Sequence, residues 1–122
     1  MADDASSQSF REELGRRELK FSERKVGDCA AFIVEEFPIR DGRNAGRILP
    51  IGFVLPRDYP SAAPAGVHYK WRGDLGNAPS NPQGSELGDG WQRMSRVVQS
   101  WTPGRRTACH YLAQVDRWLE LL

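Results

Sequence analysis

The sequence predicts an α+β domain in which a short N-terminal helix, a four-stranded antiparallel meander and an irregular crossing precede a long C-terminal helix. Three strand-like runs follow one another with only short turns between them, and residues 102–122 repeat apolar side chains at helical spacing. Consecutive strands joined by short turns pair as an antiparallel meander. Strands that are followed by a helix, rather than alternating with helices, are typical of an α+β architecture.

The N-terminal segment predicts a flexible end followed by a helix. Residues 1–8 are small, acidic and polar, so a single domain is expected to span residues 9–122. The stretch SFREELGRR then predicts one or two helical turns. Ser9 is the expected N-cap, Glu12 is its capping-box partner, and Gly15 is the expected end of the helix.

The runs with strand character cover residues 18–26, 29–39 and 47–56. The second run is almost continuously apolar from Cys29 to Val34 and suits the middle of a sheet. An Asp-Gly pair and a further glycine between the second and third runs predict a hairpin with a loop longer than two residues. A fourth short strand is expected from Gly66 to Trp71.

The crossing and the last helix complete the predicted fold. Residues 72–90 are dense in Gly, Pro, Asn and Ser, and an irregular stretch of this length in a small domain is typical of a functional loop. Thr102 is the expected cap of the last helix and Pro103 its first residue. An apolar stripe predicts that this helix packs on the sheet, and it contains Ala108, Leu112, Val115, Leu119 and Leu122, widened by Tyr111 and Trp118.

Composition disfavours several classes of partner. The 17 Lys and Arg residues against 16 Asp and Glu leave a formal net charge of +1, so no field of the whole chain attracts nucleic acid. No apolar run approaches the length that a membrane span needs. Two cysteines 80 residues apart predict reduced thiols and a cytoplasmic location. No HxxH or CxxC motif occurs, so we expect neither a metal site nor a cofactor.

One segment is more specific than the composition. LPRDYPSAAPAGVHY, residues 55–69, is a strand that ends in a connection stiffened by prolines and re-enters the sheet near Gly66. With the meander before it, this segment resembles the Tyr-Pro turn between the third and fourth strands of the ubiquitin-conjugating enzyme (UBC-like) fold. The motifs WQRMSR and WTPG, which begin at Trp91 and Trp101, are similar to those of a bacterial branch of this fold, the prokaryotic ubiquitin-conjugating-enzyme-like family E.

The resemblance extends over almost the whole chain and implies partners. It implies a carrier in a bacterial pathway that conjugates a ubiquitin-like protein, in the setting of antiphage defence. The partners implied are the ubiquitin-like protein, a ThiF-like activating enzyme and an associated peptidase. We expect the activating enzyme to contact the N-terminal helix, where Arg11, Arg16 and Arg17 are the candidate residues, although a solvated charged face explains them equally well.

The sequence departs from the family pattern at the expected catalytic position. Ubiquitin-conjugating enzymes carry a cysteine about eight residues before the tryptophan of this ending, and the residue here is Arg93, eight residues before Trp101. No His-Pro-Asn precedes the segment, and Val97 stands where a histidine is expected. Two interpretations follow: a carrier that uses another nucleophile, and an inactive variant that only binds a ubiquitin-like protein or the activating enzyme as a scaffold.

Ser95 is the hydroxyl closest to the expected position, and it lies between Arg93 and Arg96. A serine can hold the acyl group as an oxyester when it is activated, and two guanidinium groups can stabilise an oxyanion or bind a carboxylate. The alternative is an ordinary loop serine between surface arginines. His68 is the candidate base for Ser95, and Asn81 is the candidate that steadies the oxyanion. Their alternative roles are a residue on a sheet face and a turn residue.

Cys109 is the other candidate nucleophile. With the predicted start at Thr102 it lies about two turns into the last helix, beside the apolar stripe, and Arg105 and Arg106 precede it. The simpler interpretation is a small apolar thiol at a helix flank. Cys29 opens the most apolar strand and is expected in the core. We expect Trp91 and Trp101 to pack the crossing onto the sheet and the last helix.

Overall fold

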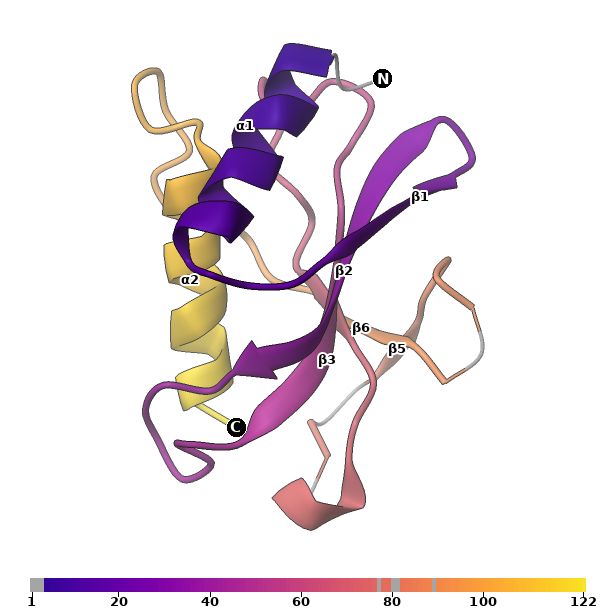
Figure 1. Ribbon diagram of the computed structural model, residues 1–122, viewed down its shortest axis with the longest axis vertical. Coiled ribbons are helices and arrows are strands. Elements are labelled where there is room, and N and C mark those ends of the chain that lie inside the picture. Colours follow the sequence, from indigo (N-terminus) through magenta and orange to yellow (C-terminus); the bar gives the residue numbers. More distant parts are fainter. Residues whose placement is uncertain (1–3, 77, 80–81, 89) are drawn as a thin grey trace.

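The computed structural model describes residues 4–76, 78–79, 82–88 and 90–122. Two α-helices lie side by side on one face of a six-stranded antiparallel sheet with strand order β1-β2-β3-β4-β6-β5 (Figure 1). A 3-10 turn, η1, lies in the crossing. In chain order the elements are α1 (Asp4–Arg16), β1 (Ser22–Val26), β2 (Cys29–Pro38), β3 (Ile48–Val54), β4 (Val67–Tyr69), η1 (Gly73–Leu75), β5 (Gln83–Gly84), β6 (Gln92–Met94) and α2 (Ala108–Glu120).

The predicted α+β class and the antiparallel meander are confirmed. Strands β1 to β4 pair in sequence order, and each pair is antiparallel. The predicted count of four strands is wrong, because β5 and β6 extend the sheet beyond β4. These two strands have only two and three residues, too few for the alternation of apolar and polar side chains that identifies a strand in a sequence.

Both helices begin at residues other than the predicted ones. Helix α1 begins at Asp4, and Ser9 lies exposed inside it rather than capping it. The earlier start places Ser7, Phe10 and Leu14 on one buried face. Helix α2 begins at Ala108, and the Thr107 hydroxyl caps it by accepting a hydrogen bond from the backbone N–H of His110 at 3.1 Å.

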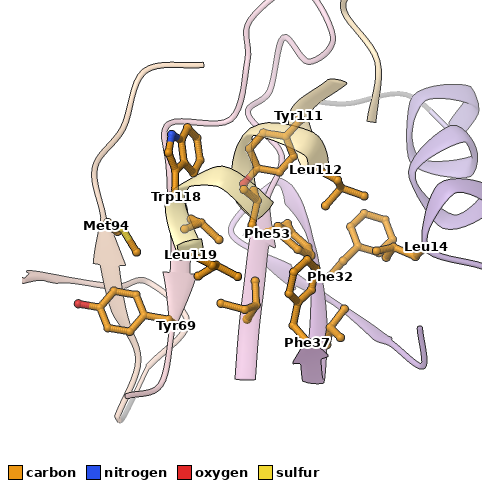
Figure 2. Close-up of a cluster of buried hydrophobic side chains, with 14 of the residues drawn as sticks. Leu14, Phe32, Phe37, Phe53, Tyr69, Met94, Tyr111, Leu112, Trp118 and Leu119 are labelled. Carbon is orange, nitrogen blue, oxygen red and sulfur yellow. The ribbon is translucent and has the colours of Figure 1, made fainter. Parts of the chain in front are cut away.

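The main core lies between the two helices and the sheet. Figure 2 shows aromatic and leucine side chains from α1, α2 and the central strands meeting in this layer. The predicted stripe of α2 is confirmed at six of its seven positions, since Leu122 is only partly buried. The hydroxyl of Tyr111 donates a hydrogen bond to the carbonyl oxygen of Gly66 at 2.5 Å and joins α2 to the start of β4.

The crossing returns over the opposite face of the sheet. Leu87 and Trp91 pack there against Ala31 and Ile33 of β2. Gly52 of β3 makes room for them, because a Cβ at this position would lie 2.4 Å from a methyl carbon of Leu87. The expectation that Trp91 anchors the crossing to the sheet is therefore confirmed.

Trp101 anchors the chain near the start of α2. It packs against the main core, and its indole N–H donates to the carbonyl oxygen of Pro60 at 2.8 Å. Its ring centroid lies 6.0 Å from that of Tyr59 and 6.1 Å from that of His110. The predicted contact of Trp101 with the last helix is confirmed.

Candidate functional site

The segment that follows β6 forms one wall of an open hollow of about 400 Å³. Arg93 belongs to β6, and Ser95 and Arg96 come directly after it. Strand β6 pairs with β4 on one side and β5 on the other, so the sheet holds this segment in place. Three of the candidate residues thus lie around one cavity, which Tyr69, Pro79, Gln83, Arg93, Met94, Ser95 and Arg96 line.

The two arginines of the hollow differ in their hydrogen bonds. A terminal N–H of Arg93 donates to the side-chain oxygen of Gln83 at 2.5 Å. The Nε of Arg93 is buried and has no hydrogen-bond partner among the described residues. Arg96 donates from Nη1 to the carbonyl oxygen of Ser95 at 2.8 Å. The hollow is therefore electropositive beside the exposed Ser95, which suits a carboxylate or a developing oxyanion.

Tyr69 adds a functional group that no sequence pattern marks. Its side chain is fully buried, and its hydroxyl has no hydrogen-bond partner in the described part of the chain. Its ring lies beside Met94 at the edge of the core (Figure 2). Burial raises the pKa of this hydroxyl, although the positive charge of Arg96 opposes the rise. The hydroxyl therefore stays protonated at neutral pH and is a free donor in a residue that lines the hollow.

His68 lies on the face of the sheet opposite the helices, and Arg93 shares that face. It pairs in register with Arg93, but its ring contacts the turn after β5 rather than Ser95. Nδ1 lies 2.7 Å from Oγ of Ser85, and Nε2 lies 3.4 Å from Oε1 of Glu86. Burial lowers the pKa of His68; the carboxylate of Glu86 opposes this, and Arg93 reinforces it. The expected contact between His68 and Ser95 is therefore absent, because both ring nitrogens of His68 contact other residues.

Asn81, the residue expected to steady the oxyanion, lies outside the described residues, so its expected role stays a prediction.

The two cysteines lie in different environments. Cys109 is exposed in the first turn of α2, rather than two turns into the helix, and lines a hollow of about 290 Å³ between α1 and α2. Cys29 is only half-buried at the first position of β2, so the expectation that it lies in the core is wrong. Among the described residues, no group of three His, Cys, Asp or Glu side chains is arranged as metal ligands would be. No helix in this part of the chain is long and apolar enough to cross a membrane.

The comparison with protein families decides the identity of the chain. The family model described as Prokaryotic E2 family E matches residues 7–121. The chain belongs to the prokaryotic E2 family E. Membership of this E2 family indicates a conjugating-enzyme-like role and, in general terms, a ubiquitin-like protein and an activating enzyme as partners. No curated protein and no solved structure matches the chain.

The arginines expected to contact an activating enzyme differ in accessibility in this E2-family protein. Arg11 forms a two-pronged ion pair with Glu23, with N–O distances of 2.7 and 2.8 Å. Arg17 is only 14% exposed and joins α1 to α2 through Asp116 at 3.0 Å. The side chain of Arg16 is 69% exposed and pairs with Glu13. Arg16 is therefore the most accessible of the three cations.

Proposed function

We propose that this E2-family protein accepts a ubiquitin-like protein from an activating enzyme as an oxyester on Ser95 and passes it to an amine. The observation that supports this most is the position of Ser95: it is exposed, follows β6 and lines the hollow with two arginines, two residues after the expected cysteine position. The proposal places the reaction in the bacterial cytoplasm, with a ThiF-like activating enzyme and an associated peptidase in the same pathway.

The transfer would proceed by acyl exchange. Oγ of Ser95 attacks the thioester carbonyl of the loaded activating enzyme, an O–C bond forms, the C–S bond breaks, and the hydroxyl proton leaves with the thiolate. The guanidinium groups of Arg93 and Arg96 stabilise the oxyanion of the tetrahedral intermediate. The proposal also assigns Tyr69 the role of a neutral donor, because the residue lines the hollow and its buried hydroxyl is unpaired within the described residues.

An intact-mass measurement tests the carrier role. The protein is incubated with the activating enzyme, the ubiquitin-like protein and ATP, and the wild type is compared with Ser95→Ala and Cys109→Ala. We expect an adduct that resists thiol reductant, is cleaved by hydroxylamine, persists in Cys109→Ala and disappears in Ser95→Ala. An adduct of full yield in Ser95→Ala would remove Ser95 from the mechanism.

One observation favours a second function, that of a non-catalytic scaffold. Arg93 occupies the position of the expected cysteine, and its long side chain is tied to Gln83. A scaffold would bind the ubiquitin-like protein or the activating enzyme without forming an adduct. Binding that is retained by a protein that never forms an adduct would establish this function in place of the first.

The exposed face of α1 provides a separate test of the partner. We expect Arg16→Glu to weaken binding of the activating enzyme about tenfold, because reversing an exposed interfacial charge slows association and removes attraction. Titration of the variant against the activating enzyme measures the effect. Arg57→Glu is the matched control, since the side chain of Arg57 is 72% exposed and lies in the connection before β4. Equal affinities of the two variants would place the contact elsewhere.

A further inference from the structure

A serine, a histidine and a glutamate lie next to one another as a relay on the face of the sheet opposite the helices, with a hydrogen bond between the serine and the histidine and a close contact between the histidine and the glutamate. Ser85 and Glu86 are consecutive residues of the turn that follows β5, and His68 belongs to β4. Oγ of Ser85 lies 2.7 Å from Nδ1 of His68, and Oε1 of Glu86 lies 3.4 Å from Nε2 of the same ring. The imidazole thus lies between a hydroxyl and a carboxylate, which is the order of groups in an activated serine nucleophile.

The protonation of this relay follows from its partners. The Glu86 carboxylate can only accept, so its position beside Nε2 favours the tautomer with the hydrogen on that nitrogen, and this tautomer leaves Nδ1 as an acceptor for the Ser85 hydroxyl. His68 is only 5% exposed, and burial disfavours its charged form. A neutral imidazole that accepts from a serine hydroxyl is in the form that a general base needs.

The serine is held in place by its own turn. The backbone N–H of Leu87 donates to Oγ of Ser85 at 3.0 Å, which fixes the hydroxyl and would stabilise negative charge on it. Leu87 is itself buried against the outer face of the sheet, and its carbonyl oxygen accepts a hydrogen bond from the guanidinium of Arg24. Ser85 remains partly exposed, so a substrate can approach it.

A small hollow lies beside two members of the relay, His68 and Glu86. Its volume is about 140 Å³, and His68, Glu86 and Arg93 line it together with apolar side chains that include Val54 and Pro56. Arg93 brings a positive charge to this wall, and its Nε has no hydrogen-bond partner among the described residues. The hollow offers apolar surface for a small acyl group and a cation for an oxyanion.

We propose that Ser85, His68 and Glu86 form a second acyl-accepting site, which hydrolyses activated esters of small acyl groups. Oγ of Ser85 bonds to the acyl carbon, the bond from that carbon to the leaving alcohol breaks, and the serine proton passes through His68 to the departing oxygen. Water then attacks the acyl-serine, His68 takes one of its protons and returns it to Oγ, and the carboxylic acid leaves. This activity requires no ubiquitin-like protein and is independent of the function proposed for Ser95.

The test uses the purified full chain with p-nitrophenyl acetate for the rate and an alkyl fluorophosphonate, followed by peptide mapping, for the site. We expect the fluorophosphonate on Ser85, with no label and no ester turnover above background in Ser85→Ala. His68→Gln is expected to slow both reactions about 10²-fold or more, because a general base contributes that much. Ser61→Ala is the matched control, since Ser61 is exposed in the connection before β4 and touches neither hollow. A label on another residue, or turnover unchanged in Ser85→Ala, would overturn the proposal.

A second variant keeps the proposal testable if Ser85→Ala unfolds the turn. In Ser85→Cys the same imidazole lowers the pKa of the new thiol, so we expect iodoacetamide to alkylate it at least several-fold faster than the exposed Cys109 of the same chain. Adding His68→Gln is expected to remove this advantage while Cys109 reacts as before. Equal rates at the two thiols in Ser85→Cys would show that His68 does not activate this position.

Discussion

Replacing Gly66 with alanine is expected to lower the free energy of unfolding by about 3 kcal/mol or more, because it adds a steric clash to backbone strain. Gly66 has φ +106°, which side chains rarely adopt, and a Cβ there would lie 2.1 Å from the carbonyl oxygen of Met94 and 2.9 Å from the backbone nitrogen of Arg96. Both neighbours are backbone atoms and cannot rotate away. Relief of the clash would move the end of β6 from β4, so we also expect Gly66→Ala to reduce any reaction at Ser95.

Gly88 provides the control for the strain alone. It has the same φ of +106°, but within the described part of the chain, apart from its sequence neighbours, no atom lies within 4 Å of the Cβ that alanine would add. Gly88→Ala should therefore cost only about 1–3 kcal/mol. Urea denaturation of both variants measures the difference as a shift in the midpoint at unchanged slope. Equal losses would show that β6 yields to the added methyl group without cost.

Replacing Phe10 with alanine is expected to lower the free energy of unfolding by about 3–5 kcal/mol, because it leaves a cavity under helix α1. Phe10 is fully buried, and its ring centroid lies 4.9 Å from that of Phe32, 5.5 Å from that of Phe53 and 6.1 Å from that of Tyr111. Through this ring α1 contacts both the sheet and α2. The loss is large against the 5–15 kcal/mol that stabilises a typical domain.

Phe10→Leu is the matched variant for this position. It keeps an apolar side chain at the centre of the cluster and should retain more than half of the stability that alanine loses. Thermal and urea unfolding followed by circular dichroism measure both variants. A loss below about 1 kcal/mol in Phe10→Ala would mean that α1 contributes little to the core, since full burial of an aromatic side chain stabilises by more than that.

The apolar pattern of the sequence was sufficient to predict the main layers. The continuous run from Cys29 predicts a strand, and β2 is a central strand of the sheet, paired with β1 and β3. The stripe of α2 predicts which side chains enter the core, because burial of a helix face imposes a period of about 3.6 residues. The start of α2 could not be predicted as well, because Thr102-Pro103 and Thr107 both carry capping signals. Residues 102–105 form a separate turn, in which the N–H of Arg105 donates to the carbonyl oxygen of Thr102 at 2.8 Å.

The candidate site could be predicted only in part. The spacing to Trp101 identified Arg93, Ser95 and Arg96, and these residues lie around one hollow. His68 attracted notice as one of two histidines, but nothing along the chain indicates that its ring meets Ser85, 17 residues away. The unpaired hydroxyl of Tyr69 could not be predicted either, since a hydrogen bond that is missing is visible only when all neighbours are in place.

The sequence by itself determined the α+β class, the meander and the buried face of the last helix, and its motifs at Trp91 and Trp101 indicated the E2 family. These features depend on local periodicity and on residues close together in the chain. Only the tertiary structure decided that β5 and β6 extend the sheet. It also decided that Arg17 forms a mostly buried ion pair with Asp116 instead of lying free on the surface, and that Ser85 rather than Ser95 lies beside a histidine. Each of these depends on contacts between distant segments. Strands of two or three residues and single polar pairs acquire their partners only when the rest of the chain has packed around them.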